Sequence, residues 1–534
     1  IIQNSTFSSN TANQEGENEG NQGFGGSIYI CTSFESNGAQ CTTGITIIGC
    51  TFENNRAYQG YGIYIQGTTS CNPTININDN HFNNDQGTII HPKGSGTIAS
   101  EITSLNIEDI ENSNYFTNTN DNIKHLIFVD NIGDPLPDAT PTPSPLTDPN
   151  FINNTFTGSA GVDQVQAGLN NINEISGCQF TNIHDTGRNY YIKINKEIPI
   201  YNNIFENTEL IPSNNEKAGI FFSAFNGRIT LTNCKFIRIS GKGGEGYVFT
   251  SNQNNNIQAT MNQCEFIDCG SLSNTDLPLI TILNSASSIT LNECNFTFND
   301  LERNFRVLDI RTNNVNIFGC RFTKCGPNTI YLAKAATESS PQGTFQFRNN
   351  YVTLNEGTFI NGMKIRNKPI IENNIFEQIT LNNNYMITIS HDQTEIEFNN
   401  NTFSSISMSG SSNCDCGGIG ISVISSNSEY TIKYIKCIFK SITNNHDSGT
   451  NNHGGVIEQG FTSNSNSNLE ITGCEFNGNI IQRGHGGSLA IRSSKNIIIQ
   501  NSTFSSNTAN QEGENEGNEG FGGSIYICTS FESN

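Results

Sequence analysis

A short, degenerate template recurs along the chain and is the feature that most limits its fold. Two apolar residues stand two positions apart, Cys or Asn follows three positions later, and Phe comes two positions after that. Residues two apart point to the same side of a strand, whereas a step of three reverses the alternation. Each copy therefore predicts two short strands that meet at a corner. Copies with Cys end at Phe52, Phe236, Phe296, Phe322 and Phe476, and copies with Asn end at Phe82, Phe205 and Phe403.

The residue types at the predicted corner agree with a tight bend. Gly49, Asn233, Gly319 and Gly473 each stand just before the Cys, and Gly and Asn tolerate turn conformations. A further apolar stretch follows each Phe at a looser distance, often after paired glycines. We therefore expect three short strands in each turn of the chain.

The spacing of the template predicts the fold class. From Phe7 to Phe504 there are sixteen intervals in 497 residues, and single intervals run from 24 to 45 residues. No helical pattern separates the strands, which excludes a TIM-type barrel, and the signature of leucine-rich repeats is missing. The sequence predicts an all-β, right-handed parallel β-helix, a solenoid with about sixteen coils per 497-residue unit. Strand spacing gives such a unit a length of about 77 Å.

The sequence also contains a repeat that is much longer than this template. Residues 1–37 return as residues 498–534 with one difference, Gln22 against Glu519. This recurrence indicates near-identical tandem units, or a boundary in a repeating polymer. We expect one continuous β-helix over residues 1–534, with 1–497 as one tandem unit and 498–534 as the start of the next. Because an open end coil exposes strand edges, we expect the helix to continue end to end, in the same chain or in another.

Composition and charge exclude several classes of protein. Hydrophobic residues make up only 34% and Trp is absent, which is too polar for one compact core in 534 residues. The net charge of −22 disfavours nucleic acid and anionic membranes as partners. No apolar run reaches about 18 residues, so no membrane-spanning helix is predicted in this sequence.

The Cys and Asn of the template should face inward and stack as ladders. We expect the cysteines to be buried thiols that act as small apolar fillers, because parallel side chains suit neither tetrahedral zinc nor disulfides between coils. The buried amides should bond to one another along the axis. The predicted Cys ladder is Cys50, Cys178, Cys234, Cys264, Cys294, Cys320, Cys437 and Cys474, and the predicted Asn ladder is Asn80, Asn203, Asn350, Asn374 and Asn401.

Other cysteines and several surface features lie outside the ladders. Disulfides are predicted for Cys269 and Cys325, each three residues after a Phe, and for Cys31, Cys41, Cys71, Cys414 and Cys416. Candidate N-glycosylation sites are Asn4, Asn153, Asn295, Asn400 and Asn501, of which the template puts Asn295 on the outer surface. The acidic stretch Gln14–Gly23 should be a solvated loop, and the Pro-rich residues 134–150 a surface insertion.

The motifs resemble two related groups of proteins. The coil resembles the right-handed parallel β-helix (pectin-lyase-like) superfamily of pectate lyases and polygalacturonases. The Phe-x-x-Asn signatures, together with Gly-Gly-x-Ile or Leu, resemble the repeats of chlamydial polymorphic outer membrane proteins and of protist surface proteins. The second resemblance implies a surface passenger or adhesin fold and no catalytic residues. These signatures are Phe7–Asn10, Phe52–Asn55, Phe296–Asn299 and Phe476–Asn479.

Three short motifs invite an enzymatic interpretation. Asn274-Thr275-Asp276 resembles the first part of the polygalacturonase signature, but the paired aspartates that should follow are missing. His485 before Gly-Gly matches Phe24 and His453 in other copies, which favours a coil-entry residue, and His391-Asp392 lacks a third partner. We therefore assign no catalytic, cofactor-binding or metal-binding residue and predict no cofactor.

Three functions follow as hypotheses. The first is a structural repeat protein that forms an extracellular or cell-surface filament, stalk or fibre, with copies of itself as partner through end-to-end continuation and lateral association. The second is a surface adhesin that binds glycans or a host surface. The third, a polysaccharide lyase or hydrolase, would require carboxylates and basic residues from three or more coils to converge in one groove.

Overall fold

A computed structural model gives the arrangement of the strands in two compact units, residues 1–250 and 251–534, and each unit is described by itself. The Pro-rich residues 134–149 and the acidic stretch Gln14–Gly23 lie outside the described residues. The structure describes residues 1–10, 27–31, 44–53, 63–67, 74–78, 81–83, 90–94, 115–118, 150–152, 155–158, 174–182, 184–185, 192–194, 196–210, 220–223, 225–241, 248–251, 254–271, 278–282, 284, 286–299, 306–312, 314–326, 329–332, 344–365, 369–382, 385–391, 395–410, 419–425, 430–446, 455–459, 467–482, 486–491, 496–509 and 524–527.

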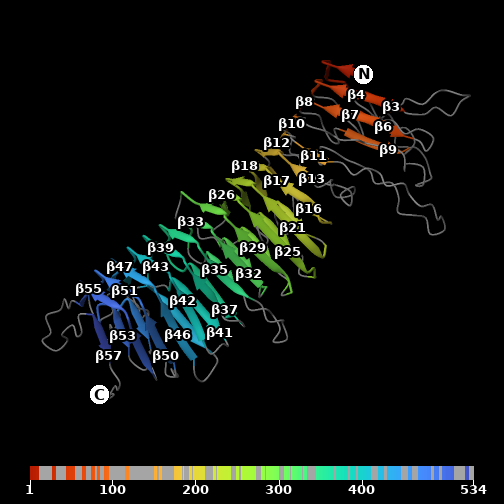
Figure 1. Cartoon of the computed structure of the whole chain (residues 1–534). Helices are drawn as coiled ribbons and strands as arrows, with labels where there is room; N and C mark the ends of the chain where they lie inside the picture. The colour runs from red at the N-terminus through yellow and green to blue at the C-terminus, as the bar shows by residue number, and fades with distance from the viewer. Residues whose placement is uncertain are drawn as a thin grey trace, which may run out of the picture. The chain divides into compact units, whose positions relative to one another are not determined.

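Strands form all the regular structure of these described segments, and every pairing between them is parallel (Figure 1). Three main sheets run along each unit. The first sheet holds the apolar-pair strands, the second sheet holds the Phe strands, and the third sheet holds the strands that follow. Most strands pair with their equivalent one turn of the chain later. The predicted all-β parallel β-helix is therefore confirmed.

The first unit contains coils whose strands are mostly three to five residues long. Its first-sheet strands are β1 (Ile2–Gln3), β4 (Gly44–Ile48), β7 (Thr74–Asn78), β11 (Asn150–Ile152), β13 (Glu174–Ser176), β17 (Pro199–Tyr201) and β21 (Gly227–Thr232). Its second-sheet strands are β2 (Thr6–Ser8), β5 (Thr51–Glu53), β8 (His81–Asn83), β10 (Tyr115–Asn118), β12 (Thr155–Gly158), β14 (Gln179–Thr181), β18 (Ile204–Glu206) and β22 (Lys235–Ile237). Its third-sheet strands are β3 (Ile28–Cys31), β6 (Ile63–Gly67), β9 (Ile90–Gly94), β16 (Ile192–Ile194), β20 (Phe221–Ser223) and β24 (Phe249–Ser251), of which β24 spans the boundary.

The second unit repeats the same order of strands. Its first-sheet strands are β25 (Ile257–Asn262), β29 (Ser288–Asn292), β32 (Asn314–Phe318), β35 (Phe345–Arg348), β38 (Ile370–Glu372), β42 (Glu395–Asn399), β46 (Tyr430–Ile435), β50 (Ser467–Thr472) and β54 (Ile497–Gln500). Its second-sheet strands are β26 (Glu265–Ile267), β30 (Asn295–Thr297), β33 (Arg321–Thr323), β36 (Tyr351–Thr353), β39 (Ile375–Glu377), β43 (Thr402–Ser404), β47 (Ile438–Lys440), β51 (Glu475–Asn477) and β55 (Thr503–Ser505). Its third-sheet strands are β28 (Ile280–Ile282), β31 (Leu308–Ile310), β34 (Ile330–Leu332), β37 (Ile360–Ile365), β41 (Ile387–His391), β45 (Ile421–Ser425), β49 (Ile457–Gln459), β53 (Leu489–Ile491) and β57 (Ile525–Ile527).

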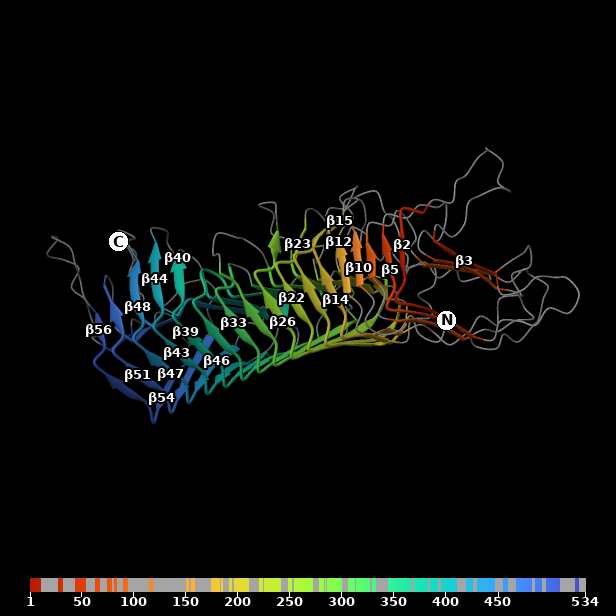
Figure 2. The same cartoon turned by 90° about the horizontal axis from the view of Figure 1, so that it is seen from above.

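A short fourth strand follows the Phe strand in several coils, which the prediction of three strands per turn did not include. These strands turn away from the second sheet, as Figure 2 shows for β40, β44 and β48 beside β43 and β47. The turn comes from a second corner just after the Phe strand. The short strands are β15 (His184–Asp185), β19 (Glu209–Leu210), β23 (Ser240–Gly241), β27 (Gly270–Ser271), β40 (Thr380–Asn382), β44 (Ser407–Gly410), β48 (Thr443–His446), β52 (Ile480–Ile481) and β56 (Thr508–Ala509).

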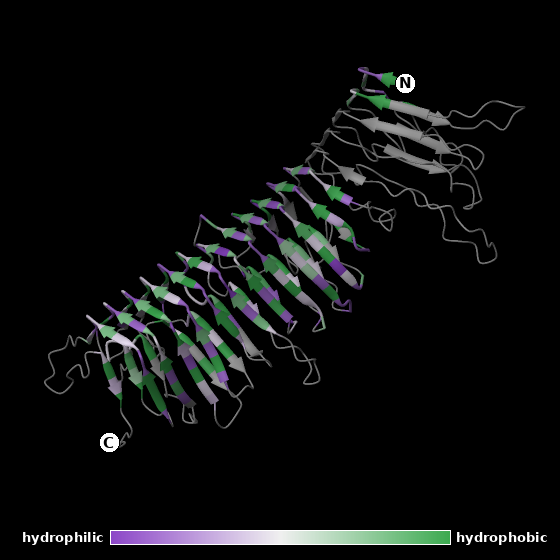
Figure 3. Cartoon of the chain, in the orientation of Figure 1, coloured by the Kyte–Doolittle hydropathy of each residue, from purple (hydrophilic) through white to green (hydrophobic). Residues whose placement is uncertain are grey.

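The core of each unit is a stack of inward side chains in register. Phe376, Phe403 and Phe439 align residue for residue, and their parallel rings lie 5.1 and 5.2 Å apart. All three are fully buried, and the apolar residues of the first sheet stack beside them. Apolar and polar residues alternate along these strands (Figure 3), with the apolar ones inside. Each coil is therefore buried mainly by the coils before and after it.

One coil breaks the Phe stack and shows how the core compensates. Val352 takes the place of Phe between Phe322 and Phe376. Phe359, from the same coil, packs edge-on against Phe322 with ring centres 5.1 Å apart, and it is fully buried. Phe359, which directly precedes a strand of the third sheet, thus fills the space that the smaller Val352 leaves in the second sheet.

This compensation can be tested by changing both positions. Phe359→Ala should lower the free energy of unfolding by about 3–5 kcal/mol, because it opens a cavity in a dry core. Val352→Phe alone should cost about 1–3 kcal/mol by overpacking. The double variant should be more stable than Phe359→Ala alone, as measured by urea unfolding. Strictly additive losses would contradict the compensation.

Candidate functional site

The first corner of each described coil is a single residue in the left-handed region. Asn and Gly are the common types there, as expected for residues that tolerate positive φ. One such residue between two strands reverses the side-chain alternation and turns the next side chain inward. The first-corner residues are Asn4, Gly49, Gly177, Asn202, Asn233, Gln263, Glu293, Gly319, Asn349, Asn373, Asn400, Lys436, Gly473 and Asn501, with φ between 49° and 65°.

A second corner of the same kind follows the Phe strand, and the sequence interpretation missed it. In most described coils one residue has positive φ, two positions after the Phe or its equivalent, and the next residue points inward. The sequence signal of this corner is the Phe-x-x-Asn spacing, which the sequence analysis treats as a family signature and not as a bend. The second-corner residues include Ser9, Asn182, Asn207, Arg238, Asp268, Lys324, Leu354, Gln378, Ser405, Ser441, Gly478 and Ser506.

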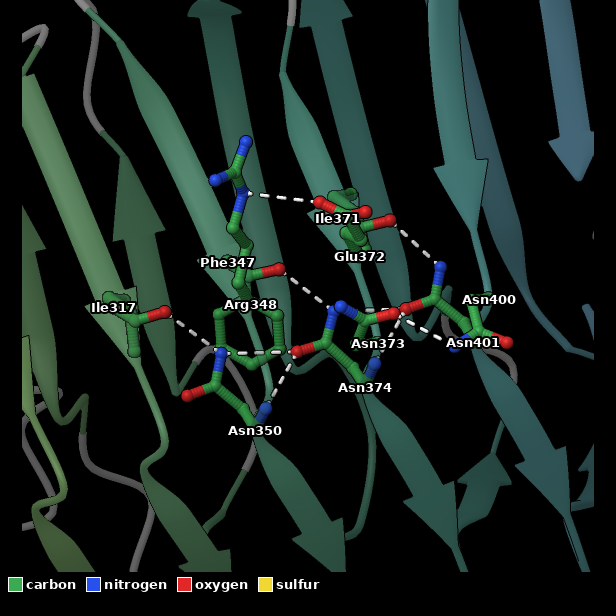
Figure 4. Close-up of polar contacts among 10 residues, drawn as sticks. All are labelled: Ile317, Phe347, Arg348, Asn350, Ile371, Glu372, Asn373, Asn374, Asn400 and Asn401. Atoms are coloured by element: carbon green, nitrogen blue, oxygen red, sulfur yellow. Dashed lines mark hydrogen bonds and ion pairs between the residues drawn. The ribbon is translucent and has the colours of Figure 1, made fainter.

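The inward residue after the first corner forms the Asn ladder (Figure 4). Asn374 Oδ1 accepts hydrogen bonds from the backbone N–H of Asn350 at 2.9 Å and from Asn350 Nδ2 at 3.1 Å. Asn374 Nδ2 donates to the carbonyl of Phe347 at 2.8 Å and to Asn401 Oδ1 at 2.9 Å. All hydrogen-bonding positions of this buried amide are therefore used, and each Asn reaches back to the preceding coil.

The other predicted Asn positions behave in the same way where they are described. Asn203 Oδ1 accepts from the Cys178 N–H at 3.0 Å, and its Nδ2 donates to the Ile175 carbonyl at 2.9 Å. Asn401 Nδ2 donates to the Ile371 carbonyl at 2.8 Å. Asn80 lies outside the described residues.

Every predicted Cys-ladder position is buried, with at most 2% of its surface exposed, and each carries a reduced thiol. The thiols also occupy the hydrogen-bonding position of the Asn amides. Cys294 Sγ lies 3.3 Å from the Met261 carbonyl, and Cys437 Sγ lies 3.2 Å from the Phe398 carbonyl. In both cases the acceptor is the residue three before the ladder position on the preceding coil. Cys and Asn are thus interchangeable as donors as well as in volume.

Burial raises the pKa of several of the buried thiols. Burial raises the pKa of Cys437, and it also raises the pKa of Cys325 well above the ordinary value of 9.0. The hydrogen bond with Cys264 lowers the pKa of Cys294, but the bond with Cys320 and burial outweigh it, so that the pKa is raised. Cys294 and Cys437 are therefore held as neutral thiols, whereas the hydrogen bond with Cys437 lowers the pKa of Cys474.

The inward residue after the second corner forms a second ladder. Asn479 Oδ1 accepts from the Ile442 N–H at 3.1 Å, and Asn507 Oδ1 accepts from Asn479 Nδ2 at 2.9 Å. Asn479 Nδ2 and Asn507 Nδ2 also donate to the carbonyls of Phe439 and Phe476. This is the arrangement of the first ladder at a different corner.

The disulfides predicted for Cys269 and Cys325 are wrong. Both residues are fully buried reduced thiols in this second ladder. Their equivalents on neighbouring coils are residues such as Asn355 rather than cysteines, so the second corner offers no partner sulfur. Cys31 ends β3, and Cys41, Cys71, Cys414 and Cys416 lie outside the described residues.

The glycosylation sequons coincide with the corners. Asn4, Asn400 and Asn501 are exposed first-corner residues with positive φ, and the Thr of each sequon begins the next strand. Asn400 Nδ2 donates to Asn373 Oδ1 at 2.8 Å. Asn295 is exposed at the start of β30, and Asn153 lies outside the described residues. The template alone accounts for the three corner sequons, because it favours Asn at the bend and Thr at a strand start.

The motifs considered for catalysis are not brought together by the described part of the chain. Residues 274–276, His485 and Asp392 lie outside it, and His391 ends β41. Among the residues described, no three or more His, Cys, Asp or Glu side chains are grouped to hold a metal ion. No helix in these same segments is long and apolar enough to cross a membrane.

Comparisons with protein-family models, with curated proteins and with solved structures gave no match for this chain. The fold is therefore defined by its own strand pairing, and the corner ladders are the sites that its geometry supports.

The Asn ladder predicts an ordered series of substitutions at Asn374. Asn374→Ala should destabilise the protein by about 3 kcal/mol or more, because several buried groups lose their partners at once. Asn374→Cys should cost less, because a thiol can donate to the Phe347 carbonyl. Asn382→Ala, at an exposed Asn of the next short strand, is the matched control and should change the stability by about 0.5 kcal/mol at most. Thermal unfolding would measure all three, and equal losses for Ala and Cys would contradict donation by the thiol.

Burial of Cys325 predicts a loss of stability at alkaline pH. Its pKa is raised in the folded state, so its contribution is complete below the ordinary value of 9.0 and decreases as the pH rises above it. The wild type should lose about 1.4 kcal/mol more per pH unit there than Cys325→Ala. Ser404→Ala, which removes no titrating group, should keep the wild-type slope. Urea unfolding at several pH values above 9.0 tests this, and identical slopes for all three proteins would count against it.

Proposed function

We propose that this protein is a structural repeat protein whose 497-residue units join end to end into an elongated extracellular or cell-surface filament, stalk or fibre. The units assemble because the end coil of one unit stacks on the first coil of the next. Its main partner is then a further unit of the same sequence, either in the same chain or in another copy.

The main support for this proposal is that the two copies of the recurring sequence pack against their neighbours through opposite faces of the coil. At the start of the chain, Phe7 stacks on Phe52 of the following coil at 5.0 Å. At residues 498–527 the same sequence forms a coil whose Phe504 stacks on Phe476 of the preceding coil at 4.7 Å. One coil sequence thus fits the last coil of a unit on one side and the second coil of a unit on the other. This is what a continuous succession of units requires.

The nature of the core also supports a structural role. In a solenoid each coil contacts only its neighbours, so stability grows with every coil added and no closed core limits the length. The ladders and the Phe stack extend this principle along most of the described coils. The same coil geometry favours membership of the pectin-lyase-like β-helix superfamily, with repeats related to chlamydial polymorphic outer membrane proteins.

The adhesin alternative would be favoured by rows of exposed aromatic rings. Two of the outward aromatics that the structure describes are instead covered by guanidinium groups. Arg321 lies over the ring of Tyr351 at 4.6 Å and Arg306 over the ring of Tyr331 at 4.1 Å. The structural role is therefore the better supported of the two, and nothing in the described part of the chain favours the enzyme.

A two-unit chain tests the proposal. Residues 1–497 followed by residues 1–534 should give particles about 77 Å longer than the present chain, because sixteen more coils are stacked in line. Electron microscopy of both proteins would measure this difference. A two-unit particle that is folded back, or that shows two separate bodies at variable angles, would contradict continuous stacking.

A further inference from the structure

We propose that the outward face of the second sheet around β43 binds a second copy of this chain, side by side and antiparallel. The face is formed by β39, β43 and β47, which Figure 2 shows next to one another and which pair in register. The inference goes beyond the stacking of units, because it concerns the side of the solenoid and not its ends.

This face, called the lateral face below, consists of the two outward residues of each Phe strand. Each strand is three residues long and lies between two corners with positive φ, so that one outward residue precedes the Phe and one follows it. The structure describes residues 369–382, 395–410 and 430–446 without a gap. The strands, both corners and the short fourth strands of these three coils are therefore all defined.

Two apolar side chains on the lateral face are exposed, although described coils lie on both sides of them. Ile375 is 40% exposed and Ile438 is 37% exposed. Away from the two terminal coils, these two and Leu354, at the second corner of the preceding coil, are the most exposed large apolar residues that the structure describes. Exposed apolar side chains that gather on one face are typical of an interaction surface.

The charges on the lateral face identify the partner. The coil before β43 presents Ile375-Phe376-Glu377, and the coil after it presents Ile438-Phe439-Lys440. Thr402 lies opposite Ile375 on one side and opposite Ile438 on the other. The two flanking coils thus offer the same apolar residue at the same place and opposite charges beside it, which makes the face complementary to itself.

A two-fold axis through Thr402 and parallel to β43 realises this complementarity. It reverses the order of the coils and leaves the direction of the strands unchanged, as in an aligned packing of two sheets. Ile375 then faces the partner's Ile438, and Glu377 faces the partner's Lys440. Because the axis repeats every contact, two apolar pairs and two ion pairs form around Thr402.

The next residues along the row extend the match. Tyr351 lies beside Ile375, and Glu475 lies beside Ile438, so the same axis brings Tyr351 opposite the partner's Glu475. The guanidinium of Arg321 covers the Tyr351 ring at 4.6 Å from its centre, and the Tyr351 hydroxyl donates to Glu377 Oε2 at 2.7 Å. The partner's Glu475 therefore approaches a positive charge on a ring that is already held in place.

The size of the lateral face sets the strength of the contact. Five coils, from Tyr351 to Glu475, extend about 24 Å, and a strand with its corners extends about 16 Å, which gives about 400 Å² per copy. Stable interfaces bury about 800 Å² per partner, so a reversible dimer with a dissociation constant of about 100 μM is expected. Because each copy carries a net charge of −22, the contact should be measured at about 0.15 M salt, where long-range repulsion is screened.

Sedimentation equilibrium of the 534-residue chain tests the proposal by charge reversal. Glu377→Lys alone and Lys440→Glu alone should each weaken the dimer by about tenfold or more, because like charges then face each other twice. An equimolar mixture of these two variants should associate as tightly as the wild type, since each contact of the mixed dimer again joins opposite charges. The double variant Glu377→Lys/Lys440→Glu should also dimerise.

Two further variants separate the lateral face from general effects. Ile438→Ser should weaken the dimer by about tenfold or more, because it removes both apolar pairs. Glu197→Lys, an equal change of charge at an exposed residue of the first unit, should keep the wild-type dissociation constant. Thermal unfolding of each variant would check that these outward substitutions leave the coils folded.

Three results would overturn the proposal. These are a wild type that stays monomeric at several times the expected dissociation constant, a mixture of folded variants that associates no more tightly than either variant alone, and a loss of association in Glu197→Lys as large as in Glu377→Lys. None of them affects the length of the two-unit chain, because the residues of the lateral face point away from the stacked core. Failure of side-by-side pairing and failure of the filament proposal are therefore distinguishable.

Discussion

The structure depends on a single backbone constraint, one residue with positive φ between two short strands. That residue reverses the side-chain alternation, so that the next side chain enters the core at a corner. A polar group at such a place must find partners inside the protein, because no water reaches it. The Asn and Cys side chains meet this demand by bonding to the backbone of the preceding coil. The corner therefore places the ladder residue in the core, and the hydrogen bonds of that residue set the stacking register of the whole coil.

The two ladders also explain how a chain with few hydrophobic residues forms a stable core. The inward side chains are few per coil, but each one is covered above and below by its equivalents, as Phe403 is by Phe376 and Phe439. Along the described strands the polar side chains alternate with the inward apolar ones and stand on the outward side. A composition that excludes a compact domain is therefore sufficient for a solenoid, where every coil shares its burial with two neighbours.

The periodic features of the fold could be predicted from the sequence, and the features that depend on one coil could not. The three-residue step to Cys234 or Asn203 requires a bend whatever the neighbouring coils contain, so the first corner and its inward residue follow from local geometry. The second corner was missed because its inward position holds Thr208, Ile239, Cys325 or Asn479, which share no obvious chemistry. The assignment of Cys269 and Cys325 to disulfides failed for the same reason, since the pattern that buries them was not recognised. Refilling of the Val352 gap by Phe359 depends on packing across coils, which no local pattern encodes.

The amide ladder has a direction, and this has a consequence for how the chain is made. Asn374 and Asn401 both satisfy groups on the coil that precedes them in the sequence. A ribosome delivers those preceding coils first, so each newly emerged turn brings the amide that completes the one already folded. The solenoid can consequently be built in the order of its synthesis, one turn at a time, without waiting for distant parts of the polypeptide.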